Sequence, residues 1–348
     1  MSSIYPVIIT FIMTCLAINL LKPLATQYGL VDSPNERKHH TGEIPLIGGL
    51  AIYLSILLAT MIFVPQSQEL NLYLISSALI LFLGVLDDKY DLSVKLRIVA
   101  QVIIASMMIF GAGLYLTSLG EIFYFFDLQL GLVGVFVTVI AVIGSINAFN
   151  MVDGIDGLAG TLSVVTFSSL GYLLYQADSE WYMLSVLYVS ALLAYLMFNL
   201  RWPSSKLQKI FMGDAGSMLI GLTVVWLLVV GTNVDTQAFS PVIALYLIAI
   251  PLMDMAAIMY RRVKKGTSPF KPDRDHLHHI FERAGYTRKQ TLVRISILAT
   301  LIALLGLMGE NYNVPEWIMF AGFLMLFSAY NWALSNVWKI LTWIRQES

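Results

Sequence analysis

Charged residues are scarce in this chain. Only 12% of its 348 residues are Asp, Glu, Lys or Arg and 58% are hydrophobic, whereas an average soluble domain is about 25% charged and roughly 45–50% apolar. This composition indicates lipid as the solvent around much of the chain. The net charge of -1 and the lack of a dense basic tract argue against nucleic acid as a partner, because binding a phosphate backbone needs a clustered positive face.

Cysteine and linker-like segments are also nearly absent. Cys15 is the only cysteine, so it has no partner for an intramolecular disulfide and is expected to be a packing residue. The chain shows no Ser/Gly-rich linker, low-complexity tract or fixed-period repeat. We therefore expect one membrane domain over residues 1–348.

Long apolar runs are abundant. Runs long enough to cross a bilayer, which takes about 17–25 residues, predict an all-α polytopic membrane protein with about eleven transmembrane helices. The runs are 4–21, 45–64, 70–86, 98–116, 130–146, 158–174, 181–200, 217–230, 241–260, 292–307 and 317–337.

Lys and Arg orient these runs, because cytoplasmic loops carry an excess of both. With the N-terminus outside, all 21 Lys and Arg fall on one side, and the opposite loops carry only acids. This predicts a periplasmic N-terminus, a cytoplasmic C-terminus, and cytoplasmic loops at about 22–44, 87–97, 147–157, 201–216 and 261–291. The first run has no basic residue before it and Lys22 after it, so it is expected to be an uncleaved span.

Five aspartates stand at helix ends on the predicted cytoplasmic side. Asp87 and Asp88 lie in GVLDDKYD, Asp153 and Asp156 in NAFNMVDGIDG, and Asp214 in FMGDAGS. One such residue would be explained as an interfacial group solvated by headgroup water, but five on one side indicate function, since ionisable groups near a bilayer are costly. Converging carboxylates repel one another unless a cation neutralises them, and Mg²⁺ prefers carboxylate and phosphate oxygens. We therefore expect a divalent metal.

Glycines accompany these aspartates. Gly154, Gly157, Gly213 and Gly216 remove side chains where backbone must approach something, and a helix N-terminus offers N–H groups to an anion such as phosphate. Close helix packing is the alternative explanation for them.

The last predicted inner loop, RRVKKGTSPFKPDRDHLHHIFERAG, adds basic residues and histidines. Lys264 and Lys265 are expected to touch anionic headgroups, and His39 and His40 in the first inner loop are given a loop or headgroup role. Zinc binding by the HLHH cluster is disfavoured, because neither a cysteine nor a spaced fourth ligand accompanies it. The better hypothesis is that the cluster donates hydrogen bonds to a diphosphate.

The motifs GVLDDKYD, NAFNMVDGIDGLAG, FMGDAGS, PLMDMAAIMYRR and SPFKPDRDHLHH together resemble the polyprenyl-phosphate N-acetylhexosamine-1-phosphate transferases over residues from about 30 to about 317. The peptidoglycan branch of that family carries three consecutive histidines where this chain has His276, Leu277, His278 and His279, which favours the GlcNAc branch. The resemblance implies eleven spans in a bacterial inner membrane, an active site facing the cytoplasm, and dependence on Mg²⁺ or Mn²⁺. It also implies transfer of GlcNAc-1-phosphate from UDP-GlcNAc to undecaprenyl phosphate, at the start of O-antigen or enterobacterial common antigen synthesis.

The resemblance also implies roles for individual residues. Asp214 and Asn150 would hold the metal. Asp87 and Asp88 would position the lipid phosphate or take its proton. Asn147, Asp153 and Asp156 would contact the nucleotide, and Arg262, His276, His278 and His279 would close on the diphosphate and sugar. Direct attack and an aspartyl intermediate both stay open.

Several alternatives stay open as well. The same chemistry could use another UDP-N-acetylhexosamine, and a homo-oligomer is compatible with the sequence. An ion- or proton-coupled transporter is the main alternative of another class, because buried acids also serve proton relays. Asp254, inside the ninth run, is the acid that suits a transporter. The other explanation for Asp254 is a structural hydrogen bond to a neighbouring helix. Transporter sites usually lie near the midplane in repeated halves, which this chain does not show. A CDP-alcohol-type transferase is disfavoured because its DG…AR…G…D…D spacing is absent.

Overall fold

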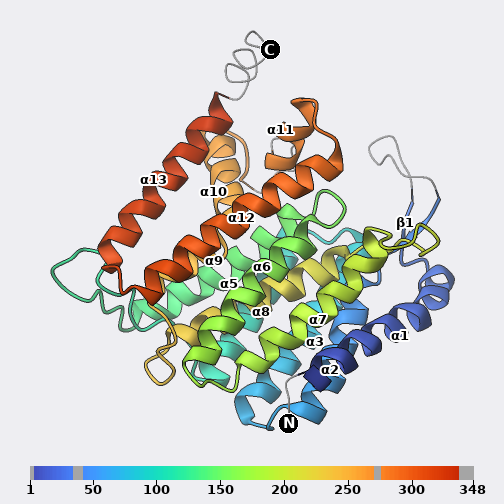
Figure 1. The fold of residues 1–348 in the computed structure, drawn as a ribbon, viewed down its shortest axis with the longest axis horizontal. Coiled ribbons are helices and arrows are strands. Elements are labelled where there is room, and N and C mark those ends of the chain that lie inside the picture. Colours follow the sequence, from blue (N-terminus) through green and yellow to red (C-terminus); the bar gives the residue numbers. More distant parts are fainter. Residues whose placement is uncertain (1–3, 34–41, 270–275, 337–348) are drawn as a thin grey trace.

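Helices make up most of the molecule in Figure 1, a computed structural model that describes residues 4–33, 42–269 and 276–336. In chain order they are α1 (Ile4–Tyr28), α2 (Gly48–Phe63), α3 (Gln68–Tyr90), α4 (Val94–Ser106), the π-helical turn η1 (Met107–Gly111), α5 (Val133–Val152), α6 (Leu158–Gln176), α7 (Tyr182–Asn199), α8 (Gly213–Thr232), α9 (Pro241–Leu247), α10 (Ala249–Lys264), α11 (Leu277–Arg283), α12 (Arg288–Asn311) and α13 (Glu316–Ser335). Two short strands, β1 (Val31–Asp32) and β2 (Ile44–Pro45), pair antiparallel. The predicted helical class is confirmed.

The helices identify a multi-pass membrane protein. Within the described residues, nine helices are long and apolar enough to cross a membrane, and the bent pair α9–α10 makes a tenth if it is counted as one span. The apolar helix α2 has only 16 residues. Every one of the eleven predicted runs overlaps these helices. The count of eleven spans is not confirmed, because α2 is short for a span and the α9–α10 pair is bent by 84°.

Pro251 accounts for the bend between α9 and α10. Proline has no backbone N–H, and its ring collides with the carbonyl four residues earlier. That carbonyl belongs to Leu247, where α9 ends. The apolar run predicted at 241–260 is therefore two helices, and the proline was the signal in the sequence for the break.

Helix α8 forms the centre of the bundle, since 94% of its apolar segment is buried, against 22% for α1 and 17% for α13. Two glycines let α2 and α3 approach its first turn. A Cβ at Gly49 would lie 2.3 Å from the backbone nitrogen of Gly216, and one at Gly84 would lie 2.3 Å from Cα of Ala215. Small residues at crossings are the usual means of close packing between membrane helices. The packing explanation is therefore the correct one for Gly216.

Backbone hydrogen bonds join the first loop to the segment before α8. The N–H of Gly48 donates to the carbonyl of Phe211 at 2.9 Å, and the N–H of Phe211 donates to the carbonyl of Pro45 at 2.9 Å. These bonds place the start of α2 beside the start of α8. Residues from distant parts of the chain thus meet at one end of the bundle.

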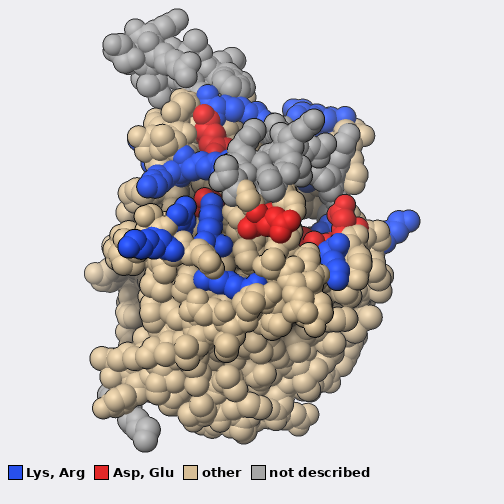
Figure 2. All heavy atoms as spheres, turned by 90° about the vertical axis from the view of Figure 1, so that its right-hand side faces the viewer, with Lys and Arg blue, Asp and Glu red and all other residues tan. Residues whose placement is uncertain are grey.

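Charged residues gather at that end. Figure 2 shows Lys, Arg, Asp and Glu together at one end of the face drawn, with a broad surface of other residues beyond them. The outer helices expose aliphatic side chains such as Leu20 on α1 and Ile140 on α5. This arrangement agrees with the one-sided distribution of Lys and Arg along the sequence.

Candidate active site

An acidic cavity of about 520 Å³ opens where the ends of α3 and α5 meet the start of α8. All five aspartates that the sequence singled out line it: Asp87, Asp88, Asp153, Asp156 and Asp214. His279, Glu282 and Arg288 from the C-terminal part of the chain complete one wall. The expectation that the aspartates converge at one end of the bundle is confirmed.

Asp214 stands in the first turn of α8 and is held by α5. The side-chain amide of Asn150 donates to Oδ1 of Asp214 at 2.8 Å and also reaches Oγ of Ser217 at 3.0 Å. The structure therefore places the two predicted metal ligands in direct contact.

Asp88 holds the same turn of α8 from the other side. Its carboxylate accepts hydrogen bonds from the backbone N–H of Asp214 at 2.8 Å and of Ala215 at 3.2 Å. A carboxylate at a helix N-terminus satisfies N–H groups that have no partner within the helix and interacts favourably with the helix dipole. Gly213 makes room for it, because a Cβ at this position would lie 2.6 Å from Oδ2 of Asp88. Asp88 thus orients the turn that carries Asp214.

Asp87 has protein partners for both of its carboxylate oxygens. Oδ1 accepts from the N–H of Leu92 at 2.8 Å, and Oδ2 pairs with Nη1 of Arg97 at 2.6 Å. The side chain of Asp87 is only 2% exposed. The sequence alone did not single out Arg97, which lies on α4 and bonds Asp87. The pair fixes α4 against the end of α3 at the cavity wall.

Asp153 directly follows α5 and lines the cavity. Desolvation by the surrounding protein, followed by the negative charges of Asp214, Asp88 and Asp156, raises the pKa of its carboxyl group to about 7. Desolvation is the largest cause of this shift, and the three neighbouring carboxylates add to it because like charges disfavour ionisation. A cation bound among these carboxylates would offset their repulsion.

The cavity fits Mg²⁺ or Mn²⁺ if a few protein oxygens bind the ion and water and substrate complete its shell. Among the residues that the structure describes, no three His, Cys, Asp or Glu side chains form a group that could hold a metal ion. Mg²⁺ commonly uses one or two carboxylates and completes its shell with water and substrate phosphate oxygens. The carboxylate of Asp214 and the side-chain carbonyl of Asn150 offer oxygen donors of this kind.

Of the three residues predicted to contact the nucleotide, two line the cavity and one does not. Asp153 and Asp156 line the cavity, and Asp156 also pairs with Nζ of Lys209 at 2.6 Å. Asn147 lies outside the lining, and its amide donates to Oε1 of Gln101 at 3.0 Å and to the carbonyl of Ile143 at 2.8 Å. This geometry ties α5 to α4, so Asn147 is placed as a link between helices.

The three histidines also differ from one another. His279 lines the cavity and lies 3.4 Å from Oε2 of Glu282. His278 is 2% exposed, and among the described residues neither of its ring nitrogens has a hydrogen-bond partner. Burial, then the neighbouring His279 and His276, lowers the pKa of His278 to about 3, so its ring is neutral at physiological pH. His276 is buried beside His278, and their stacked rings have centroids 5.6 Å apart.

Two of the glycines that the sequence singled out lie in close contact with other side chains. A Cβ at Gly154 would lie 2.1 Å from Nε2 of His278. Gly157, the residue just before α6, has φ +77° and lies against the side chain of Leu200. Glycine adopts this left-handed conformation without steric cost. Both glycines therefore allow contacts within the protein.

Arg262 is buried at the end of α10, away from the described lining of the cavity. Its Nη1 donates to the carbonyl of Pro269 at 2.5 Å, and its own carbonyl accepts from the N–H of Thr267 at 3.0 Å. It therefore shapes the start of the loop that leads to the histidines. His39 and His40 lie outside the described residues.

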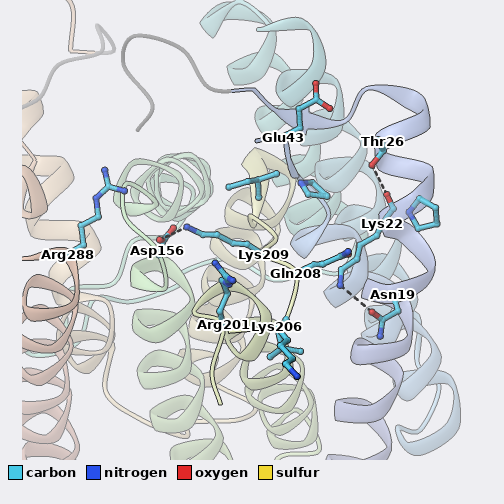
Figure 3. Close-up of a pocket in the computed structure, with 14 residues that line it drawn as sticks. Asn19, Lys22, Thr26, Glu43, Asp156, Arg201, Lys206, Gln208, Lys209 and Arg288 are labelled. Carbon is cyan, nitrogen blue, oxygen red and sulfur yellow. Dashed lines mark hydrogen bonds and ion pairs between the residues drawn. The ribbon is translucent and has the colours of Figure 1, made fainter. Parts of the chain in front are cut away.

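A second pocket, of about 1020 Å³, adjoins the acidic cavity and carries the opposite charge (Figure 3). Its basic residues come from α1, from the segment between α7 and α8, and from α12: Lys22, Arg201, Lys206, Lys209 and Arg288. Glu43 and Asp156 are its acidic residues, and Asp156 and Arg288 also line the acidic cavity. A basic surface beside the cavity raises the local concentration of anions there.

Comparisons with known proteins agree with this site. The family model of glycosyl transferase family 4 matches residues 70–232, which include the aspartates of α3, α5 and α8. Undecaprenyl-phosphate alpha-N-acetylglucosaminyl 1-phosphate transferases are similar over nearly the whole chain. The one from Pasteurella multocida (strain Pm70) is 46% identical over 97% of this chain and 95% of its own length. The one from Haemophilus influenzae is 45% identical, over 98% and 96%. The one from Escherichia coli (strain K12) is 44% identical, over 97% and 92%. The chain therefore belongs to the undecaprenyl-phosphate alpha-N-acetylglucosaminyl 1-phosphate transferases of glycosyl transferase family 4.

Proposed function

We propose that this protein transfers GlcNAc-1-phosphate from UDP-GlcNAc to undecaprenyl phosphate. An oxygen of the lipid phosphate attacks the sugar-linked phosphorus, the bond from that phosphorus to the bridging oxygen breaks, and UMP leaves. The product is a lipid-linked sugar diphosphate that can begin an O-antigen or enterobacterial common antigen chain. The observation that carries the proposal is the convergence in one cavity, beside a basic pocket, of five aspartates from α3, from the turn after α5 and from α8.

Phosphoryl transfer needs alignment and charge neutralisation more than covalent assistance from the protein. A bound Mg²⁺ or Mn²⁺ supplies that neutralisation, and Asp214 and Asn150 are its proposed ligands. Asp88 orients the turn that carries Asp214, and we assign Asp87 and Asp88, which line the cavity, to positioning the lipid phosphate. Asp153 and Asp156 take the nucleotide side, and Asn147 supports them through its bond to α4. The histidine segment covers the diphosphate, and Arg262 shapes the loop that leads to it.

Radiolabelled substrates test this function. Membranes containing the protein are incubated with undecaprenyl phosphate and either labelled UDP-GlcNAc or labelled UDP-GalNAc, and the lipid is then extracted. We expect label in the lipid fraction with UDP-GlcNAc and far less with UDP-GalNAc. Equal labelling would replace the proposed sugar specificity with a broader one, and no labelling with either sugar would refute the transferase.

The proposed topology is eleven spans in a bacterial inner membrane, with the N-terminus in the periplasm and the cavity facing the cytoplasm. The one-sided distribution of Lys and Arg supports it. We expect single cysteines at Asp178 and Asp235, in a Cys15→Ala background, to react with an impermeant thiol reagent on intact cells. Cysteines at Ser205 and Thr267 should react only after lysis. Labelling at Thr267 before lysis would contradict the cytoplasmic active site.

Metal binding is expected to compete with protons. Asp153 has a pKa of about 7, and an acid with a raised pKa is neutral below that value, so the cavity loses negative charge as the pH falls. The affinity for Mg²⁺ should therefore drop between about pH 8 and about pH 6, by up to about tenfold per pH unit below 7 if binding displaces one proton. Calorimetry on protein in lipid nanodiscs measures this directly. Asp153→Asn should weaken the dependence, because one of the protonatable carboxylates of the cavity is removed, and a wild-type affinity independent of pH would contradict the expectation.

A further inference from the structure

Asp254 is a buried acid that the proposed chemistry does not yet use. It lies on α10, is 2% exposed, and receives hydrogen bonds from three directions. Oδ2 lies 3.0 Å from Nδ1 of His276, and Oδ1 accepts from the N–H of Leu277 at 3.1 Å and from the hydroxyl of Tyr330 at 2.9 Å. One carboxylate thus joins α10, the start of α11 and α13.

The bond to His276 defines the state of the imidazole ring. An ionised carboxylate only accepts hydrogen bonds, so Nδ1 of His276 carries the hydrogen in this pair. Nε2 is then the ring nitrogen left to accept a proton or, in the protonated ring, to donate one to a phosphate oxygen. A carboxylate that fixes the tautomer and orientation of a histidine in this way is a recurrent device at catalytic sites.

His276, which Asp254 holds, is connected to the acidic cavity through the rings of His278 and His279. His276 stacks on His278 at 5.6 Å, and His278 lies against His279 at 4.2 Å. Nε2 of His278 abuts Gly154, the residue after Asp153, and His279 lines the cavity itself. The position of the His276 ring therefore sets the position of the whole histidine segment relative to the aspartates.

A helix-to-helix hydrogen bond alone does not account for this arrangement. Tyr330 would suffice to tie α10 to α13, yet Asp254 also takes the ring of His276 and the next backbone N–H. The same contacts disfavour a proton-relay role, because both oxygens already have fixed donors in the protein.

We propose that Asp254 is a positioning residue for the transfer reaction. It orients His276 and fixes the first turn of α11, and through the adjoining rings of His276 and His278 it holds His279 at the cavity wall. This inference rests on the proposed function, because it assumes that the cavity beside His279 binds the substrate. Tyr330 supports the carboxylate from α13.

A double-mutant cycle distinguishes positioning from a general structural role. Asp254→Asn should lower kcat by about 10–100-fold, the usual loss when a supporting carboxylate is removed, with a smaller effect on KM for UDP-GlcNAc. In a His276→Gln background the same change should cost no more than about threefold, because coupled residues are not additive. Equal losses in both backgrounds would overturn the proposal. Asp254→Glu should recover part of the activity, and Tyr330→Phe, which leaves the carboxylate and His276 in place, should lose less than Asp254→Asn.

A second measurement keeps this inference separate from the proposed function. NMR of isotope-labelled histidine ring nitrogens, with His276 assigned by its loss in His276→Gln, reports the tautomer without any substrate. We expect a hydrogen on Nδ1 in the wild type and a changed tautomer population in Asp254→Ala, which removes the acceptor for that hydrogen. An unchanged ring in Asp254→Ala would refute the pairing, whereas a wild type that shows the pairing but releases no UMP would refute only the transferase function.

Discussion

Asp214→Asn is expected to reduce UMP release by at least about a hundredfold, since removing even an indirect partner of a metal commonly costs about 10–100-fold. Asparagine has nearly the same shape and can still accept the hydrogen bond that Asn150 donates. The fold should therefore survive, and the melting temperature in nanodiscs should stay close to that of the wild type. Kinetic assays across a range of Mg²⁺ concentrations measure the effect, and excess Mg²⁺ should restore little of the activity.

Ser217→Ala is the matched control on the same helix. It removes the other side-chain oxygen near the amide of Asn150 but leaves the bond between Asn150 and Asp214. Turnover should stay within about threefold of the wild type, as expected for the loss of one ordinary hydrogen bond. If Asp214→Asn is active at ordinary metal concentrations, or if Ser217→Ala is as damaged as Asp214→Asn, then Asp214 does not hold the metal.

Gly154→Ala should both destabilise the protein and slow turnover by about tenfold or more. Its Cβ would lie 2.1 Å from Nε2 of His278, so the histidine segment and the Asp153 turn must separate, and overpacking of this kind typically costs about 1–3 kcal/mol. Thermal unfolding and UMP release measure the two effects.

Gly144→Ala, on α5, is the control in which the added methyl group has room. The nearest group to its added Cβ would be Cε of Met255 at 3.8 Å, which is ordinary contact. Alanine favours a helix interior over glycine by about 0.8–1.0 kcal/mol, so this variant should be as stable as the wild type or more stable. Similar behaviour of the two variants would show that the histidine segment does not pack against Gly154.

The sequence predicted the membrane helices well because hydropathy reports directly which segments lie in lipid. It also predicted the convergence of the aspartates, because all five stand at helix ends on the side where Lys and Arg gather. The break at Leu247 was missed because the run around it is continuously apolar, and only Pro251 indicates a bend there.

Partners distant in the chain could not be predicted from a single sequence. Lys209 pairs with Asp156 across 53 positions, and Tyr330 bonds Asp254 across 76. Nothing local to any of these residues specifies its partner, since the pairing depends on how the helices pack. For the same reason the sequence did not predict that Arg262 would bond the carbonyl of Pro269 or that Asn147 would bond Gln101.

The most direct test of the central claim follows the phosphorus atom. Purified protein in nanodiscs is given undecaprenyl phosphate, Mg²⁺ and UDP-GlcNAc that carries a radioactive β-phosphate. The account predicts that label enters the lipid fraction in a one-to-one ratio with unlabelled UMP, and that Asp214→Asn, prepared in the same way, transfers none. Label that stays in released UDP while the sugar enters the lipid would show that the sugar moves without its phosphate, and would contradict the account.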